Sequence, residues 1–227
     1  MISYIKIFFI AIDCLIIAIL TILVSPFDRK GRIVHYLSKV FSKVILSISG
    51  VKINVSGIEY LDPKEKYIFV SNHLSYYDIP ILMQCIPNTL RFIYKKSINK
   101  IPLFGWAMYL GKYIPIDRSD GRSALKSLRR ASQIIKKGIS VSIFPEGTRS
   151  KDGKIGEFKK GIFVLADEAN EMIVPITIIG TNKILPKHKF RIVPGEARII
   201  IHKPMAFKRD KYFLQEIRDT ITSVYLQ

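Results

Sequence analysis

The sequence predicts an α/β protein: a mixed, mostly parallel sheet flanked by helices, with an N-terminal membrane-embedded helical segment. From Val51 onward, strand-like runs rich in Ile, Val, Tyr and Phe alternate with helix-like stretches, which is typical of a sheet covered by helices. Near the N-terminus, the apolar run Ile7–Val24 contains a single charge, Asp13. Apolar residues make up 48% of the chain despite a net charge of +18, and this combination excludes an intrinsically disordered protein.

The first expected element is a membrane helix over Ile7–Val24, which reaches the lower end of the length that a spanning helix needs. One alternative is a cleavable signal peptide, although the run is long for one and no small-x-small cleavage pattern follows it. The other alternative is an ordinary buried helix. Lys6 precedes the run, whereas Arg29, Lys30 and Arg32 follow it. This asymmetry predicts that the rest of the chain lies on the cytoplasmic side of the membrane.

The second expected element is an amphipathic helix over Gly31–Gly50. Apolar residues recur at helical spacing from Leu37 to Ile48, and Lys39 and Lys43 lie away from that stripe. Such a helix is typical of the membrane interface, and the alternative is a surface helix packed on the protein's own core. With the first segment it could form a hairpin that lies in one leaflet. Residues 1–50 are therefore predicted to be membrane-anchoring helices.

Residues 51–227 are predicted to form one α/β domain, because the sequence contains no internal repeat, low-complexity tract or long linker. The expected strands are Lys52–Val55, Tyr67–Ser71, Arg91–Tyr94, Tyr113–Ile116, Ser140–Phe144, Met172–Ile179 and Glu196–Ile201. The clearest helices between and after them are Ser123–Lys137, which Gly138 should end, Lys159–Asn170 and Tyr212–Leu226.

A metal site is not expected. The four histidines are dispersed, and neither a CxxC nor an HxxxH spacing occurs, which excludes a structural zinc site on sequence grounds. The two cysteines, Cys14 and Cys85, are not expected to form a disulfide, because Cys14 lies in the apolar run.

The first candidate site is a histidine–aspartate pair. The strand Tyr67–Ser71 runs into Asn72 and His73, and Asp78 follows five residues after the histidine, near the start of the next helix. A turn can bring the carboxylate to one imidazole nitrogen, which leaves the other nitrogen to accept a proton near neutral pH. The alternative is a capping aspartate beside a loop histidine.

A histidine–aspartate pair acts by removing the proton of a nucleophile, which can be a serine or a cysteine of the protein itself. The sequence has no GxSxG motif and no cysteine near a histidine, so an acyl-serine or acyl-cysteine intermediate is not expected. The pair would then activate a hydroxyl group of the substrate, or a water molecule.

The second candidate site is the run from Phe144 to Ser150, which follows another strand. Glu146 can accept hydrogen bonds from hydroxyl groups, Gly147 lets the backbone approach a ligand, and Arg149 offers a planar fork that fits phosphate. The alternative is a plain surface turn.

Two weaker patterns accompany these sites. A short strand ends at Asp117–Arg118, which by itself is typical of a surface ion pair. The apolar run Val174–Thr177 contains a proline, which indicates a core strand near the edge of the sheet.

Together, and in this order, these stretches resemble the glycerophospholipid acyltransferase family, of the 1-acyl-sn-glycerol-3-phosphate (lysophosphatidate) acyltransferase type. The resemblance covers about residues 50–205. It rests on Asn72-His73-x4-Asp78, the Gly-x4-Ile-Asp-Arg ending at Arg118, the unbroken Phe144–Ser150, Val174-Pro175-Ile176 and the linking stretch 95–106.

The resemblance implies an activity and a site. A fatty acyl group passes from a thioester, acyl-CoA or acyl-carrier protein, to the free hydroxyl of 1-acyl-sn-glycerol 3-phosphate, which gives phosphatidic acid. It also implies that no metal and no bound cofactor are used. It assigns proton removal to His73, support of the imidazole to Asp78, and contacts with the glycerol phosphate to Arg118, Glu146, Gly147, Arg149 and, as a further candidate, Lys95.

The positive charge fits a bilayer as partner, because each basic residue near an anionic leaflet contributes about 1 kcal/mol of attraction. The same charge could attract acyl-carrier protein or the phosphates of CoA. Nucleic acid is not an expected partner, since the sequence lacks an RNP motif and a recognisable helix-turn-helix. Basic residues are dense at Lys95, Lys96, Lys100, Arg122, Lys126, Arg129, Arg130, Lys136 and Lys137.

Two other functions remain open. One is an acyltransferase of the same superfamily that acts on glycerol 3-phosphate, another lysophospholipid or an acceptor without phosphate. The other is a non-catalytic basic protein that binds membranes, for which the net charge is the only support.

Overall fold

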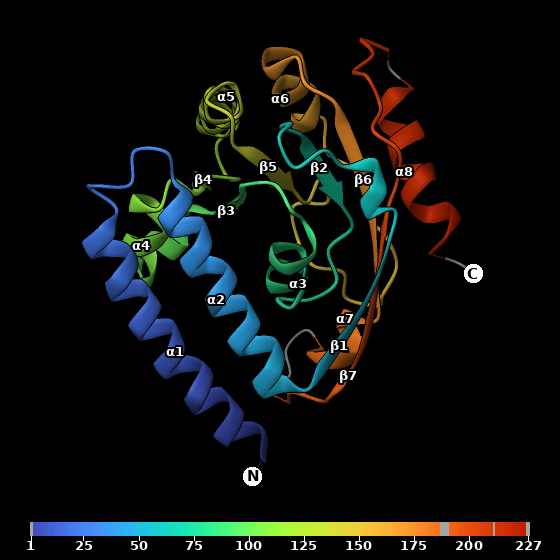
Figure 1. The fold of residues 1–227 in the computed structure, drawn as a ribbon. Coiled ribbons are helices and arrows are strands. Elements are labelled where there is room, and N and C mark those ends of the chain that lie inside the picture. The colour runs from blue at the N-terminus through green and yellow to red at the C-terminus, as the bar shows by residue number, and fades with distance from the viewer. Residues whose placement is uncertain (1, 187–190, 211, 226–227) are drawn as a thin grey trace.

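The computed structural model describes residues 2–186, 191–210 and 212–225, and Figure 1 shows its ribbon. Its centre is a sheet with the strand order β1-β7-β6-β2-β5-β3-β4. Every neighbouring pair is parallel except β6 and β7, which confirms the predicted mixed, mostly parallel sheet. The strands are β1 Val51–Ser56, β2 Ile68–Ser71, β3 Leu90–Lys95, β4 Ile114–Ile116, β5 Ser140–Ile143, β6 Ile173–Ile179 and β7 Gly195–Ile201.

Helices cover both faces of the sheet (Figure 1). The alternation along β2 shows why two cores exist: Phe69 belongs to the core under α2 and α3, whereas Ile68 and Val70 belong to the core under α5, α6 and α8. The helices are α1 Ile2–Val24, α2 Arg32–Ser49, α3 Asp78–Cys85, α4 Phe104–Leu110, α5 Gly121–Lys136, α6 Gly161–Ala169, α7 Thr181–Ile184 and α8 Phe213–Ser223, with the short 3-10 helices η1 Ile58–Tyr60 and η2 Lys96–Lys100.

Several predicted boundaries are close to the observed ones. The carboxylate of Asp120 accepts hydrogen bonds from the first backbone amides of α5, and Gly138 follows the helix with a φ of 89°, as expected of a helix stop. The last helix was predicted over Tyr212–Leu226; α8 ends at Ser223, and Leu226 lies outside the described residues.

One prediction is wrong. The proline-containing run Val174–Thr177 does not lie near an edge, because β6 is an interior strand between β7 and β2. The proline is tolerated there because the antiparallel ladder with β7 starts only at Ile176, so Pro175 stands beyond it.

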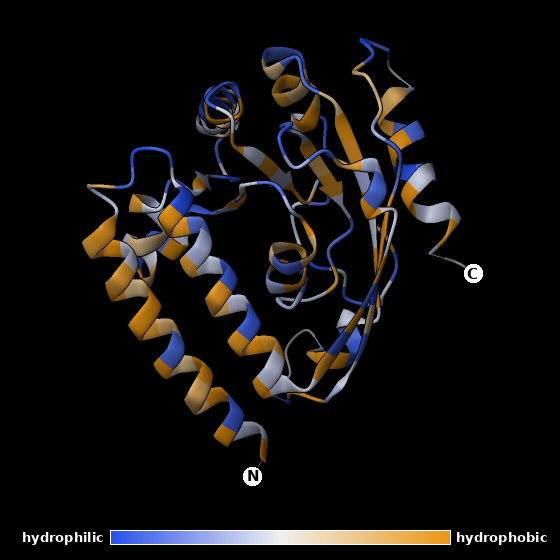
Figure 2. Ribbon diagram, viewed as in Figure 1, coloured by the Kyte–Doolittle hydropathy of each residue, from blue (hydrophilic) through white to orange (hydrophobic). Residues whose placement is uncertain are grey.

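The two N-terminal helices form an antiparallel pair on one side of the molecule (Figure 1). Near its start α1 is fixed by a hydrogen bond from Lys6 Nζ to the carbonyl oxygen of Ser49, at 3.0 Å. Figure 2 shows that α1 is mostly apolar. Ile7 and Ile10 pack on the core, whereas most other large apolar side chains of α1 are exposed. Among the described residues, α1 is the one helix long and apolar enough to cross a membrane, by length and composition alone.

The turn between α1 and α2 is bound to the sheet through hydrogen bonds of buried charged side chains. The guanidinium of Arg91 is fully buried and donates to the carbonyl oxygens of Gly31 at 2.7 Å, Gly111 at 2.7 Å and Leu90 at 2.8 Å. Gly31 is required here because its φ is 69° and a Cβ would lie 2.7 Å from the guanidinium.

Two further residues complete this attachment. The carboxylate of Asp28 accepts hydrogen bonds from the backbone amides of Arg32 and Val34, and so starts α2. Lys112 Nζ donates to the carbonyl oxygens of Asp28 at 2.8 Å and Arg29 at 2.7 Å. We call Arg91, Lys112 and Asp28 the attachment cluster.

Candidate active site

The candidate site lies at the carboxyl ends of β2 and β5, which are adjacent parallel strands. The loops that follow these strands are bonded to each other. The backbone amide of His73 donates to Glu146 Oε1 at 2.7 Å, and the amide of Ser150 donates to the carbonyl oxygen of His73 at 2.8 Å. Two motifs about seventy residues apart in the sequence therefore form one structure, at the edge where ligands of α/β sheets usually bind.

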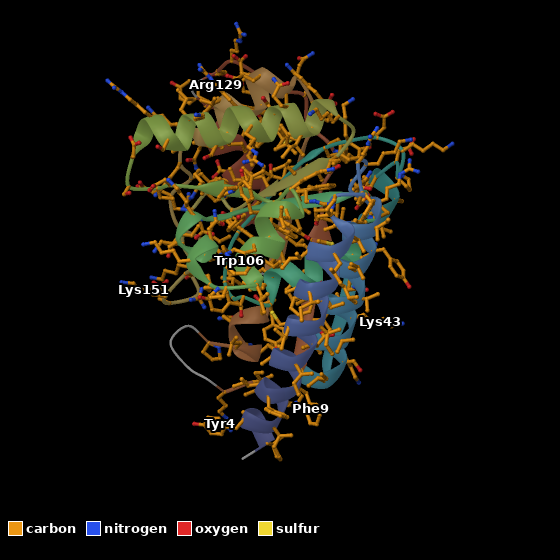
Figure 3. All side chains as sticks on the ribbon, turned by 90° about the vertical axis from the view of Figure 1, so that its left-hand side faces the viewer. Tyr4, Phe9, Lys43, Trp106, Arg129 and Lys151 are labelled. Atoms are coloured by element: carbon orange, nitrogen blue, oxygen red, sulfur yellow. The ribbon has the colours of Figure 1, made fainter. Side chains whose placement is uncertain are left out.

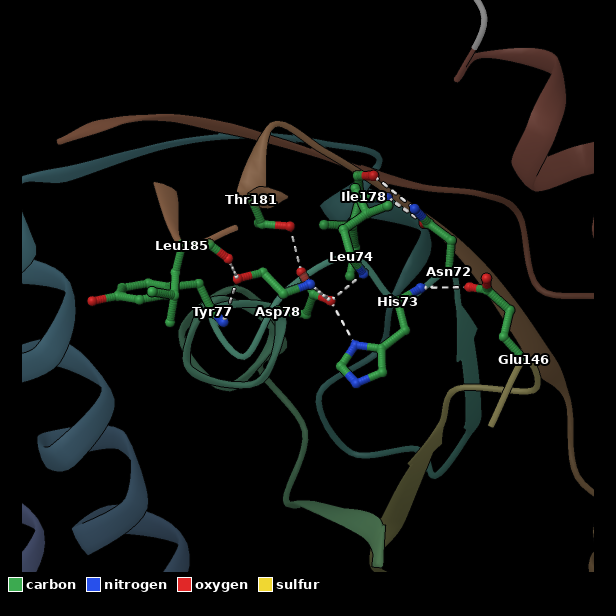
Figure 4. Close-up of polar contacts among 10 residues, drawn as sticks. Asn72, His73, Leu74, Tyr77, Asp78, Glu146, Ile178, Thr181 and Leu185 are labelled. Atoms are coloured by element: carbon green, nitrogen blue, oxygen red, sulfur yellow. Dashed lines mark hydrogen bonds and ion pairs between the residues drawn. The ribbon is translucent and has the colours of Figure 1, made fainter. Parts of the chain in front are cut away.

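His73 and Asp78 form the expected pair. His73 Nδ1 lies 2.7 Å from Asp78 Oδ2 (Figure 4). The same oxygen accepts the backbone amides of Leu74 at 2.7 Å and Ser75 at 2.9 Å, and Oδ1 accepts the hydroxyl of Thr181 at 2.5 Å. Asp78 is fully buried, and these donors hold its carboxylate in one orientation.

The imidazole of His73 is held on a second side. It stacks on the ring of Phe144, with the ring centroids 3.9 Å apart and the planes 15° from parallel. Its side chain is 13% exposed. The second ring nitrogen, Nε2, points away from Asp78 (Figure 4). The arrangement can therefore keep Nδ1–H on the carboxylate while Nε2 accepts a proton from a bound molecule.

Glu146 holds the two loops together. Its second oxygen, Oε2, accepts the backbone amide of Gly156 at 2.9 Å, so both carboxylate oxygens bind backbone groups within the protein. Burial raises the pKa of Glu146, and the hydrogen bonds from the amides of Gly156 and His73 oppose that rise. This carboxylate positions the His73 loop; the expected contact with a substrate hydroxyl stays a prediction.

The remaining predicted residues lie at the same edge of the sheet as this pair. Gly147 has a φ of 72°, and its carbonyl oxygen accepts a hydrogen bond from Arg118 Nη1. The guanidinium of Arg149 lies 3.7 Å from the ring centroid of Tyr76, in the same loop as His73. Lys95 is exposed at the carboxyl end of β3, on the same edge of the sheet. The structure thus brings the predicted residues to one edge of the sheet, and their contacts with a substrate stay predictions.

Two functional contacts were missed by sequence reasoning. Thr181, which binds Asp78, lies 103 positions away in the chain, and no local pattern marks it. Asn72 is fully buried, and its side-chain amide exchanges two hydrogen bonds of 2.8 Å with the backbone of Ile178. The sequence places Asn72 next to His73, but its partner Ile178 lies on β6, and that contact depends on the order of the strands.

Two apolar cavities lie against the loop that carries His73, since Tyr76 of that loop lines both. One, of about 660 Å³, is lined by Tyr76, Ile79, Arg149 and side chains of α1 and α2. A second, of about 230 Å³, shares Tyr76 and Ile79 with it and continues between α1, α2 and α4. Because Arg149 is the only charged side chain among the described residues that line either cavity, this region suits a long apolar chain with an anionic group at its mouth.

The described residues include no group of three or more His, Cys, Asp or Glu side chains arranged to hold a metal ion. The Cys85 thiol is buried, and burial raises its pKa to about 12, so it is not a thiolate at neutral pH.

Comparisons with known proteins agree with the geometry. The model of the family described as acyltransferase matches residues 52–179, more than half of the chain. A chloroplastic 1-acyl-sn-glycerol-3-phosphate acyltransferase of Arabidopsis thaliana is 39% identical over 202 residues, which cover 88% of this chain and 56% of the relative. One of Brassica napus is 36% identical over 217 residues, which cover 92% of this chain and 62% of the relative. This chain therefore matches less than two thirds of the length of these relatives.

A solved structure is also similar. The crystal structure of the 1-acyl-sn-glycerophosphate acyltransferase PlsC from Thermotoga maritima superposes with a TM-score of 0.84 at 25% sequence identity. The match covers 98% of this chain and 92% of that chain, so it includes the N-terminal helices as well as the sheet.

Proposed function

Because the chain belongs to the acyltransferase family, we propose that it transfers a fatty acyl group from a thioester to the free hydroxyl of 1-acyl-sn-glycerol 3-phosphate, giving phosphatidic acid. The observation that carries the proposal is the His73–Asp78 pair, whose Nε2 points away from the carboxylate, in a loop whose Tyr76 lines an apolar cavity together with Arg149. A base, a space for an acyl chain and a cation for phosphate are what this reaction needs.

The reaction follows from this geometry. His73 Nε2 takes the proton of the acceptor hydroxyl as its oxygen attacks the thioester carbonyl carbon. Asp78 stabilises the imidazolium that forms, because its carboxylate is fixed by four donors. The tetrahedral intermediate then expels the thiolate, which recovers the proton from Nε2. General-base catalysis of this kind contributes about 10²–10⁴-fold to the rate.

The phosphate of the acceptor binds at Arg149. Its guanidinium lies over Tyr76 and lines the larger cavity, so it is placed between that apolar space and the His73 loop. A planar guanidinium can bind two phosphate oxygens at once. Arg118, Glu146, Gly147 and Lys95 are the further candidates, and Arg118 is oriented by its bond to the Gly147 carbonyl oxygen.

The protein needs no resident metal or organic cofactor in this reaction, because a thioester is already activated and a base suffices for attack. Acyl-CoA and acyl-carrier protein are both candidate donors, and the exposed basic residues of α5 suit the acidic groups of either.

The protein binds a membrane along α1, with its α/β domain on the cytoplasmic side. Lys6 fixes one end of α1 and the attachment cluster fixes the other, so the helix lies along the domain over its whole length. A helix held in this way favours embedding in one leaflet over crossing both. Both substrates carry lipid tails, so this position brings the cavities to their source.

The test is product formation by the full-length protein in mixed micelles. We expect phosphatidic acid from lysophosphatidate with acyl-CoA or acyl-carrier protein, and little product from glycerol 3-phosphate or lysophosphatidylcholine. Product only from another acceptor would reassign the substrate within the family. No acyl transfer with either donor and any acceptor would overturn the proposal in favour of a non-catalytic membrane-binding protein.

A further inference from the structure

A patch of exposed apolar side chains lies on α4 and in the segment just before it. It consists of Ile101, Trp106, Tyr109 and Leu110, which are 50%, 53%, 48% and 42% exposed. Single exposed apolar residues are ordinary on soluble proteins, whereas contiguous ones indicate a contact surface. We call these four residues the α4 patch.

The α4 patch continues the outward surface of α1. The two helices pack against each other, and Trp106 lies on the same face of the molecule as Tyr4 and Phe9 of α1 (Figure 3). Phe8, Phe9 and Leu23 of α1 are each more than half exposed. The apolar surface of the N-terminal helix therefore extends onto the catalytic domain.

The position of α4 is fixed by tight local structure. Leu103, just before the helix, has a φ of 60° and a ψ of −59°, a conformation that costs about 1–3 kcal/mol in a residue other than glycine. A Cβ on Gly105 would lie 2.3 Å from the carbonyl oxygen of Ile98, so the helix packs closely on η2. The strained turn and close packing orient α4 so that Trp106, Tyr109 and Leu110 face outward, whereas Ala107 faces inward.

Basic residues surround the α4 patch. Lys96 and Lys100 are exposed on η2, although Lys96 also lies 3.5 Å from Asp117. The guanidinium of Arg130 on α5 lies 5.1 Å from the ring centroid of Tyr109. Arg29 and Lys30 are exposed in the turn after α1. Apolar and aromatic side chains bordered by cations are what the interface of an anionic leaflet binds.

We infer that the α4 patch is a second membrane contact, which enters the interface of the same leaflet as α1. The inference rests on the membrane binding proposed above. With α1 alone the domain could rotate about the helix axis. A second contact on the catalytic domain fixes that rotation and holds the cavities, which Phe104 of α4 also lines, against the leaflet.

The sequence contains a single tryptophan, Trp106, which makes the inference directly measurable. The full-length protein is reconstituted in vesicles of phosphatidylcholine and phosphatidylglycerol, with and without brominated acyl chains in the phosphatidylcholine. We expect bromolipid to quench most of the Trp106 emission, while aqueous acrylamide quenches little. Emission quenched by acrylamide and unaffected by bromolipid would overturn the inference.

A matched control moves the probe. In Trp106→Phe/Tyr212→Trp the tryptophan stands at residue 212, which is 64% exposed beside α8, away from α1 (Figure 1). We expect acrylamide, not bromolipid, to quench this variant. Equal bromolipid quenching of both probes would mean that the protein binds lipid without a preferred face, and would also overturn the inference.

A second variant measures the contribution of the patch. Trp106→Ser/Leu110→Ser removes two apolar groups, and we expect the vesicle partition coefficient to fall about tenfold. An unchanged coefficient contradicts the inference. Acyl transfer is measured in the same vesicles: bound, active protein without Trp106 quenching refutes only the α4 contact. Quenching without acyl transfer to any acceptor refutes only the proposed function.

Discussion

Two buried charged clusters lie at opposite ends of the parallel strands. Asp78 follows the carboxyl end of β2, Arg91 stands near the amino end of β3, and both side chains are fully buried. The nitrogens of Arg91 are bound to carbonyl oxygens on three sides, whereas the Asp78 cluster leaves His73 Nε2 pointing away from the carboxylate. A buried charge alone therefore does not mark an active site; what distinguishes the Asp78 cluster is a ring nitrogen that points away from its carboxylate.

This contrast predicts different consequences for the two clusters, and the largest concerns Asp78. In Asp78→Asn, one amide cannot accept all four hydrogen bonds, and the histidine loses the negative charge that stabilises its imidazolium. We expect the acyl-transfer rate to fall about 10³-fold. The measurement is kcat under saturating donor and acceptor.

Thr181→Val is the control for Asp78→Asn, because it removes one donor to the same carboxylate and keeps its charge. A smaller loss than in Asp78→Asn is expected. Equal losses would indicate that the charge of Asp78 is not what matters.

The attachment cluster predicts a loss of stability in place of a loss of chemistry. Arg91→Met keeps most of the side-chain volume but leaves the carbonyl oxygens of Gly31 and Gly111 without their donor. We expect the free energy of unfolding to fall by about 3 kcal/mol, with a kcat per folded molecule close to that of the wild type. Denaturant unfolding and titrated activity measure the two quantities.

Arg130→Met is the comparison for Arg91→Met, because Arg130 is an exposed arginine on α5. It should change the free energy of unfolding by less than 0.5 kcal/mol or so. A similar loss in both variants would mean that the buried hydrogen bonds of Arg91 stabilise the fold no more than an exposed arginine does.

His35, which lies near Arg91 of the attachment cluster, predicts that the free energy of unfolding depends on pH. Burial, with Arg91 and Lys39 nearby, lowers the pKa of His35 from 6.5 to about 4. The unfolded state therefore binds more protons between these values, and stability is lost as the pH falls from 6.5 through 4. The free energy of unfolding of the wild type should fall by about 2 kcal/mol from this group between pH 7 and pH 5.

His35→Gln removes that titration and keeps an acceptor for the Leu90 amide. The difference in the free energy of unfolding between wild type and His35→Gln should therefore be smaller at pH 5 than at pH 7, as measured by urea unfolding at both pH values. A pH-independent difference contradicts the assigned cause.

The smallest expected effect concerns the mouth of the cavity. Arg149→Ala should raise the KM for lysophosphatidate about tenfold, since one bidentate phosphate contact is lost, while the KM for the acyl donor stays the same. Lys151→Ala, an exposed cation two residues away, is the matched control and should change neither. Equal effects of the two substitutions would mean that positive charge attracts lysophosphatidate in general, without a specific contact between Arg149 and the phosphate.

The sequence predicted the parts that depend on local pattern. The strands, the amphipathic helices and the spacing of His73 and Asp78 follow from apolar periodicity and from turn geometry. The partners across the sheet could not be predicted: Thr181 on Asp78, Ile178 on Asn72 and Gly31 on Arg91. Those contacts depend on the order of the strands, which no short stretch of sequence contains.

The proline of β6 shows the same limit. A proline in a strand indicates a missing ladder bond, and sequence reasoning took that as a sign of the sheet edge. In the structure the missing bond falls where the ladder with β7 has not yet begun, inside the sheet. Glu146 is similar: its place in the motif is local, but its two backbone partners, His73 and Gly156, depend on the loop fold.

The most direct test of the account compares wild type and His73→Ala for thiol release from acyl-CoA or acyl-carrier protein, with and without lysophosphatidate. The account predicts release that requires lysophosphatidate in the wild type and falls at least about 10²-fold in the variant, with an unchanged unfolding transition. Acceptor-dependent release at the wild-type rate from folded His73→Ala would contradict the assignment of His73 as the base.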